Sequence, residues 1–220
     1  MGGPLLGPGA VMALRVLLAD DHVVVRQGLK ALLERQGLEV VAEAPDGQAA
    51  VDLAKRLRPD VAVLDIVMPL LNGVEAAHQI AEAVAEARLI LLTMHSEDHY
   101  VLDAIRDGVR GFVIKTQAAE DLFQAIHEVC RGGIYVSPGI SETVLHALRT
   151  ASASREFLTR RERQVLQLVA EGRATKQIAG LLEISAKTAE FHRARIMAKL
   201  GVHDTAGLVR YAIREGLIEP

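Results

Sequence analysis

The feature that most constrains the fold of this 220-residue chain is a repeated alternation of short apolar runs and amphipathic stretches between residues 14 and 133. The runs are "LRVLLA", "LEVVAE", "DVAVLD", "RLILLT" and "GFVIK". Between and after them, apolar residues recur at helical spacing over about 23–35, 47–57, 73–86, 97–107 and 118–131. Five strands that alternate with five helices predict a parallel sheet covered on both faces, and right-handed crossovers favour a doubly wound α/β fold.

The rest of the chain follows a different pattern. Residues 156–220 show no strand signal and predict an all-α domain of four short helices, with Thr159 and Glu162 forming a capping box and Ser185 at another helix start. We expect residues 1–11 to be a disordered extension and residues 12–133 to form the sheet domain. Residues 134–155 are expected to form a linker with one helix near 140–150.

Charge differs between the two predicted domains. From Arg155 onward the chain has 12 Lys and Arg against 8 Asp and Glu, whereas the preceding residues have 13 against 20. Only the C-terminal part is therefore suited to a polyanion. The apolar run "LILLTM" is far too short to span a membrane and the N-terminus is a poor signal peptide, so we expect a cytoplasmic protein with no membrane partner.

Polar side chains stand at the ends of four predicted strands, namely Asp20 with Asp21, Asp65, Thr93 and Lys115. Doubly wound sheets place their sites outside the carboxyl ends of the strands, so these side chains should converge. Three carboxylates there suit Mg²⁺, which offsets their mutual repulsion. The residue types also suit phosphoryl transfer, because a carboxylate can form an acyl phosphate while lysine and metal neutralise the developing charge.

The motifs "LLADDH", "DVAVLDIVMPLLNG", "LLTMH" and "GFVIKT", in this order, resemble the receiver domain of two-component response regulators over about residues 14–133. The resemblance implies a flavodoxin-like domain with a five-stranded sheet, with Asp65 as the acceptor of a phosphoryl group from a sensor histidine kinase. It also implies homodimer formation on phosphorylation. The implied ligands of Mg²⁺ are Asp20, Asp21, Asp65 and the backbone carbonyl of Val67. The implied phosphoryl-contacting and switch residues are Thr93, Phe112 and Lys115.

Some positions depart from that family, and simpler readings stay open. Val67 is apolar where many receivers carry a polar residue, and Phe112 lacks the hydroxyl of an aromatic switch. Asp21 alone could merely cap a helix, and Phe112 could be static core. We expect His22 and His95 to be bystanders, because the site chemistry is oxygen-based. An aspartate-nucleophile phosphatase is disfavoured, because that class needs a second acid at the position of Val67.

The C-terminal pattern predicts a helix-turn-helix, with a scaffold helix over 174–182, the turn "LEIS" and a recognition helix over 186–199. On the last helix, Ala189, Ile196 and Leu200 share a face that should point to the core. The opposite face is basic and suits a DNA major groove. On charge alone, a helical interaction module with a solvated basic face would fit as well.

The segments "LTRRERQVLQLVAEG", "TKQIA", "ISAKTAEFHRARIMAKLGV" and "LVRYAIREGLI" resemble the four-helix DNA-binding domain of LuxR/FixJ/NarL-class regulators. By that resemblance, the residues that hold DNA phosphates are Lys176, Lys187, Thr188, His192 and Arg193. Those that face base edges are Glu190, Phe191 and Ala194, although Phe191 could instead be core. A helix near 204–215 would pair two domains on DNA.

Together these patterns predict a transcriptional regulator of a two-component system rather than an enzyme. Phosphorylation of Asp65 would switch its binding to promoter double-stranded DNA. The alternative is a DNA-binding regulator whose receiver acts as a phosphorylation-independent dimerisation module.

Overall fold

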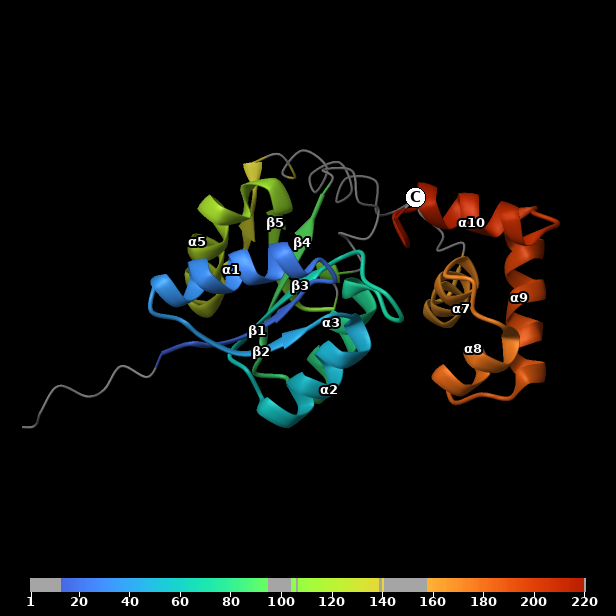
Figure 1. Ribbon diagram of the computed structural model, residues 1–220, viewed down its shortest axis with the longest axis horizontal. Coiled ribbons are helices and arrows are strands. Elements are labelled where there is room, and N and C mark those ends of the chain that lie inside the picture. Colours follow the sequence, from blue (N-terminus) through green and yellow to red (C-terminus); the bar gives the residue numbers. More distant parts are fainter. Residues whose placement is uncertain (1–12, 95–103, 106, 139, 141–157, 220) are drawn as a thin grey trace, which may run out of the picture.

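The computed structural model describes residues 13–94, 104–105, 107–138, 140 and 158–219. An α/β sheet domain precedes an all-helical domain (Figure 1). The expected N-terminal extension, the helix near 140–150 and most of the helix over 97–107 lie outside the described residues.

The described sheet is entirely parallel, with strand order β2-β1-β3-β4-β5-β6. Its strands are β1 (Arg15–Ala19), β2 (Glu39–Ala44), β3 (Val61–Asp65), β4 (Arg88–Thr93), β5 (Val109–Ile114) and β6 (Tyr135–Val136). The doubly wound fold is confirmed, but the prediction of five strands is corrected by β6. This strand pairs only two residues with Gly111 and Phe112 of β5, so it is too short to give a sequence periodicity.

Alternate residues of the strands serve the two faces of the sheet. Val16 and Leu18 of β1 pack with α1 (Val23–Arg35) and α5 (Ala118–Cys130) on one face. Leu17 and Ala19 pack on the other face with α2 (Gly47–Leu57) and α3 (Gly73–Ala83). Both faces are thus buried, which explains why the strands read as continuous apolar runs. A single 3-10 turn, η1 (Lys115–Gln117), links β5 to α5.

Four helices form the C-terminal domain, as predicted: α7 (Arg160–Ala170), α8 (Thr175–Leu181), α9 (Ala186–Leu200) and α10 (Thr205–Arg214). The predicted capping box of Thr159 and Glu162 begins α7, and the Ser185 side chain accepts a hydrogen bond from the Thr188 amide at the start of α9. Ala189 and Ile196 are buried in the core of this domain, as their spacing predicts.

Candidate functional site

The carboxyl edge of the sheet brings together the polar residues that follow the strands. Asp20 follows β1, Asp65 ends β3, Thr93 ends β4 and Lys115 follows β5. These four side chains are largely buried. The Lys115 ammonium lies 2.8 Å from Asp20 Oδ2 and 2.6 Å from Asp65 Oδ2, so one cation bridges two neighbouring acids.

Burial governs the acid–base state of Asp65, which is only 3% exposed. Removal from water raises the pKa of Asp65 to about 7, and the charges of Asp20 and Asp21 add to the rise, although the Lys115 ammonium opposes it. Burial also disfavours the charged form of Lys115, but the Asp65 and Asp20 carboxylates together outweigh this, and the pKa of Lys115 is raised. The charged form of Lys115 is therefore favoured. A further cation at the site would favour the ionised form of Asp65.

The acidic residues at this edge fit a hard cation. Asp20 Oδ2 and Asp21 Oδ1 are buried, and one ligand atom each from Asp20, Asp21, His22 and Asp65 lies within 4.8 Å of the others. Closely spaced carboxylate oxygens of this kind suit Mg²⁺. The His22 ring lies against Asp21, with Nδ1 2.8 Å from Asp21 Oδ1. His22 is also the N-cap of α1, so Asp21 does not hold that position.

The loop between β3 and α3 packs tightly against the phosphoacceptor candidate. The Gly73 amide donates to the Ile66 carbonyl at 2.8 Å, and a Cβ atom at Gly73 would lie 2.0 Å from the Asp65 carbonyl oxygen. The Asn72 side chain caps α3 by accepting from the Glu75 amide. Leu70 has a φ of 67°, a left-handed conformation that is uncommon outside glycine. The backbone of this loop is therefore packed directly against Asp65.

Two residues that the sequence did not point to reach this loop from the helical domain. The Gln167 amide of α7 donates to the Met68 carbonyl at 2.8 Å, and its oxygen accepts from the Asn72 amide at 3.1 Å and from Asn72 Nδ2 at 3.2 Å. Glu171 accepts from the Leu70 amide at 3.0 Å. A cavity of about 370 Å³ lies beside these contacts, lined by residues of both domains.

The predicted DNA-contacting residues lie on and around α9. Five of them are exposed, namely Lys176, Lys187, Glu190, Phe191 and Ala194, while Thr188, His192 and Arg193 are half-buried. The Phe191 side chain is 61% exposed, so it is not core. Arg193 Nη2 donates to the Thr205 hydroxyl at 2.6 Å, which holds this guanidinium toward the start of α10.

Comparison with known protein families identifies the two domains of the chain. The response regulator receiver domain family matches residues 16–127, and the family of bacterial regulatory proteins of the luxR type matches residues 156–212. The chain belongs to the LuxR family of response regulators. The receiver match contains Asp20, Asp21, Asp65, Thr93 and Lys115, and the second match contains the whole of α8 and α9.

Similar proteins share both domains of this LuxR-family regulator. The transcriptional regulatory protein MctR of Rhizobium johnstonii is 36% identical over 93% of this chain and 95% of its own length. The oxygen regulatory protein NreC of Staphylococcus aureus is 35% identical over 94% of this chain and its full length. The structure of RcsB in complex with DNA covers 92% of this chain and 98% of its own at 26% identity, with a TM-score of 0.58.

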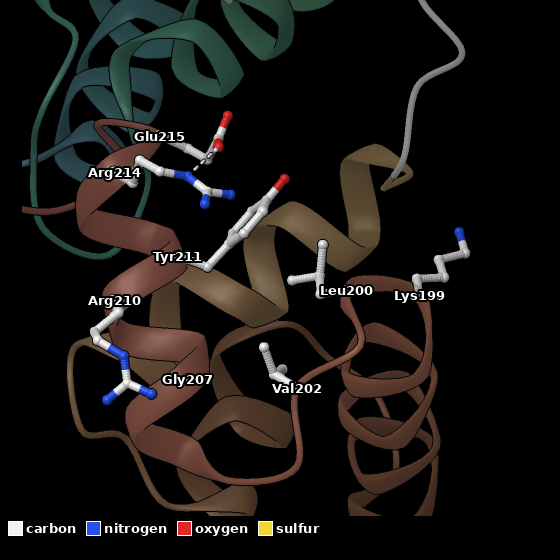
Figure 2. Close-up of a pocket in the computed structure, with 8 residues that line it drawn as sticks. All are labelled: Lys199, Leu200, Val202, Gly207, Arg210, Tyr211, Arg214 and Glu215. Carbon is white, nitrogen blue, oxygen red and sulfur yellow. Dashed lines mark hydrogen bonds and ion pairs between the residues drawn. The ribbon is translucent and has the colours of Figure 1, made fainter.

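A second cavity of the regulator, of about 760 Å³, lies between the end of α9 and α10 (Figure 2). Its lining combines apolar Leu200, Val202 and Tyr211 with basic Lys199, Arg210 and Arg214 and acidic Glu215. Arg214 lies over the Tyr211 ring at 4.9 Å and pairs with Glu215 at 3.2 Å. Among the described residues, no helix is long and apolar enough to cross a membrane.

Proposed function

We propose that this protein is a phosphorylation-switched transcriptional regulator in which a sensor histidine kinase phosphorylates Asp65. The observation that carries the proposal is the buried Asp65 carboxylate, held 2.6 Å from Lys115 at a sheet edge that also gathers Asp20 and Asp21. A buried nucleophilic carboxylate beside a fixed cation is the arrangement that acyl-phosphate formation needs.

Each residue of the site has a defined part in this chemistry. Asp65 would attack the phosphorus of a phosphohistidine, which forms the acyl phosphate and returns the electron pair to the imidazole. Lys115 would hold the transferred oxygens by charge, and the Thr93 hydroxyl would donate a hydrogen bond to one of them. Phe112 of β5 is 1% exposed and would be the switch residue that transmits the phosphorylation of Asp65 to the rest of the domain.

The residues present also fit the metal that this chemistry requires. Asp20, Asp21, Asp65 and the Val67 carbonyl would hold Mg²⁺, and the ion would neutralise charge on the transferred oxygens. The same ion would favour the ionised form of Asp65, whose pKa is otherwise raised by burial.

The output step would be binding of promoter double-stranded DNA by α9. The exposed Glu190, Phe191 and Ala194 would face base edges, and the surrounding basic and polar residues would hold phosphates. The apolar part of the groove beside α10 would pair two copies on a two-fold DNA site after phosphorylation. RcsB, a relative in fold, has been solved as dimers bound to DNA, which supports pairing of two copies on DNA. The protein would act in the cytoplasm.

Light scattering with a phosphoryl mimic tests the proposal directly. In Mg²⁺ and beryllofluoride, the wild type is expected to change from monomer to dimer, and Asp65→Asn is expected to remain a monomer. DNA affinity, measured under the same conditions, should rise only for the wild type. A wild type that takes up beryllofluoride but changes neither its mass nor its DNA affinity would refute the switch. A dimer that forms equally in both proteins would favour a phosphorylation-independent receiver.

A further inference from the structure

The contact between the two domains falls on the phosphoacceptor loop rather than on the DNA-reading helix. Gln167 of α7 is 1% exposed, although it lies 95 residues from the Asn72 that it contacts. Its side chain satisfies three polar groups of residues 68–72 and also donates to Glu171 at 2.9 Å. The nitrogen and the oxygen of the Gln167 side-chain amide therefore both bind the same receiver loop.

That loop is continuous with the site of phosphorylation. Met68, which accepts from Gln167, directly follows Val67, whose carbonyl is the proposed metal ligand. Asn72, at the other end of the contact, precedes Gly73, whose backbone packs against the Asp65 carbonyl. A side chain of the DNA-binding domain thus fixes the backbone on both sides of the turn that follows the phosphoacceptor.

Charged contacts support the same docked arrangement farther along α7. Arg160 Nη2 lies 2.7 Å from Asp107 Oδ1, and Arg163 Nε lies 3.8 Å from Glu75 Oε1. Asp107 and Glu75 are nearly buried, so the docked domain supplies the counter-charges that these receiver acids need.

Docking also forms a cavity beside the acidic cluster. The 370 Å³ cavity has Asp21, Val67, Met68 and Pro69 on the receiver side. The other side is lined by Ala170, Glu171, Arg173 and residues 217–219. Glu219 lies 3.9 Å from the His22 ring, beside the acidic cluster. The helical domain therefore places Glu171 and Glu219 beside the acidic cluster, where they would repel a phosphoryl group that approaches Asp65.

The DNA-reading surface is left uncovered by the same arrangement. In Figure 1, α9 lies at the outer edge of the helical domain, and α7 stands between it and the receiver. Phe191 is 61% exposed, and its neighbours Glu190 and Ala194 are exposed as well. Masking of α9 consequently does not explain why the two domains pack together.

We propose that Gln167 is a positioning residue of the phosphoacceptor site, through which the docked DNA-binding domain opposes phosphorylation of Asp65 while leaving α9 open. This inference rests on the proposed function of Asp65 and adds how that site is regulated. Coupling between two sites is reciprocal. If docking of α7 lowers the affinity of the Asp65 site for a phosphoryl group, the phosphoryl group lowers the affinity of α7 for the loop by the same factor.

Calorimetric titration of the full chain with beryllofluoride in Mg²⁺ measures this coupling. We expect Gln167→Ala to bind at least about five-fold more tightly than the wild type, which is the low end of typical coupling between sites. Gln167→Glu should act in the same direction, because a carboxylate cannot donate to the Met68 carbonyl. The matched control is Gln164→Ala on the same helix. Among the described residues its side chain accepts only from Arg161, so this variant should stay within two-fold of the wild type.

Two further measurements separate positioning from a general loss of structure. Amide hydrogen exchange should become faster at residues 68–72 in Gln167→Ala and stay unchanged in α9. Affinity of the unphosphorylated protein for DNA should stay within about two-fold of the wild type for every variant, since α9 is already open.

Three outcomes would overturn the inference. The first is unchanged or weaker beryllofluoride binding by a folded Gln167→Ala. The second is tighter DNA binding by that variant with no change in beryllofluoride affinity, which would indicate masking of α9. The third is a wild type that binds no beryllofluoride at all, which would overturn the proposed function of Asp65 together with its regulation.

Discussion

Replacing Gly73 with alanine tests how tightly the start of α3 packs against Asp65, the proposed phosphoacceptor. The added Cβ would lie 2.0 Å from the Asp65 carbonyl oxygen and 2.8 Å from its carbon, both of them backbone atoms. Since ordinary contacts are 3.4 Å or longer, the helix start or the end of β3 must move by roughly 1 Å or more. Overpacking of this kind costs about 1–3 kcal/mol of unfolding free energy.

Gly28 provides a matched control in the same domain. It lies in α1, is exposed, and a Cβ there meets nothing within 4 Å. Alanine at this helical position should raise the unfolding free energy by about 0.5–1 kcal/mol. The same chemical change is thus expected to have opposite signs at two glycines of one domain.

Chemical denaturation of both variants, followed by circular dichroism, measures these changes, and titration with Mg²⁺ and beryllofluoride measures the site. Gly73→Ala should also bind beryllofluoride more weakly, because the added Cβ clashes with the backbone of Asp65 itself. Gly28→Ala should bind it normally. The reasoning would be refuted by a Gly73→Ala protein that matches the wild type in both stability and binding.

Two other predictions concern the DNA-binding domain. Burial alone would raise the pKa of Glu162, but hydrogen bonds from Lys199 and from Thr159 outweigh burial and lower that pKa. The charged form of Glu162 therefore stabilises the fold at pH values above the ordinary glutamate pKa of about 4.3. Glu162→Gln should therefore lower the unfolding free energy at pH 7 by about 1 kcal/mol, and the difference should shrink in acid as pH falls through the folded pKa; a gap that is constant with pH would contradict this. Phe191→Ala should change stability by less than about 0.5 kcal/mol yet weaken DNA binding by about 1–3 kcal/mol in a gel-shift titration, whereas a large loss of stability would identify Phe191 as core.

Most of the fold could be predicted from periodicity, because both domains bury apolar faces that recur along the chain. The bounds of α1 and α2 agree with the predicted ranges, whereas the helix predicted over 73–86 ends at Ala83. Val84 leaves the helix with a φ of −138° and buries its side chain in the sheet domain. Val84 is apolar and stands at helical spacing, so its residue type does not indicate that the helix ends before it. This helix end could therefore not be predicted.

The candidate phosphoacceptor site was predictable for a different reason. Parallel strands end at one edge of a sheet, so the residues that follow them meet wherever the strands are assigned correctly. Asp20, Asp65 and Lys115 lie together as that rule requires. The bridging position of Lys115 between two acids was not predictable, because it depends on side-chain conformation rather than on strand order.

Gln167 shows where prediction from sequence ends. Along α7, Val165, Leu166, Leu168 and Val169 carry the apolar pattern and form the core of their own domain. Gln167 interrupts that pattern and therefore reads as a solvated position. Its burial comes from backbone groups of a loop almost a hundred residues away, and backbone groups leave no signature in a sequence. The Gln167 amide pairs with Met68 and Asn72 of the receiver as well as with Glu171, so it cannot leave without unpairing polar groups of the loop. The two domains are therefore coupled through the loop that follows Asp65, and the sequence of neither domain alone indicates this contact.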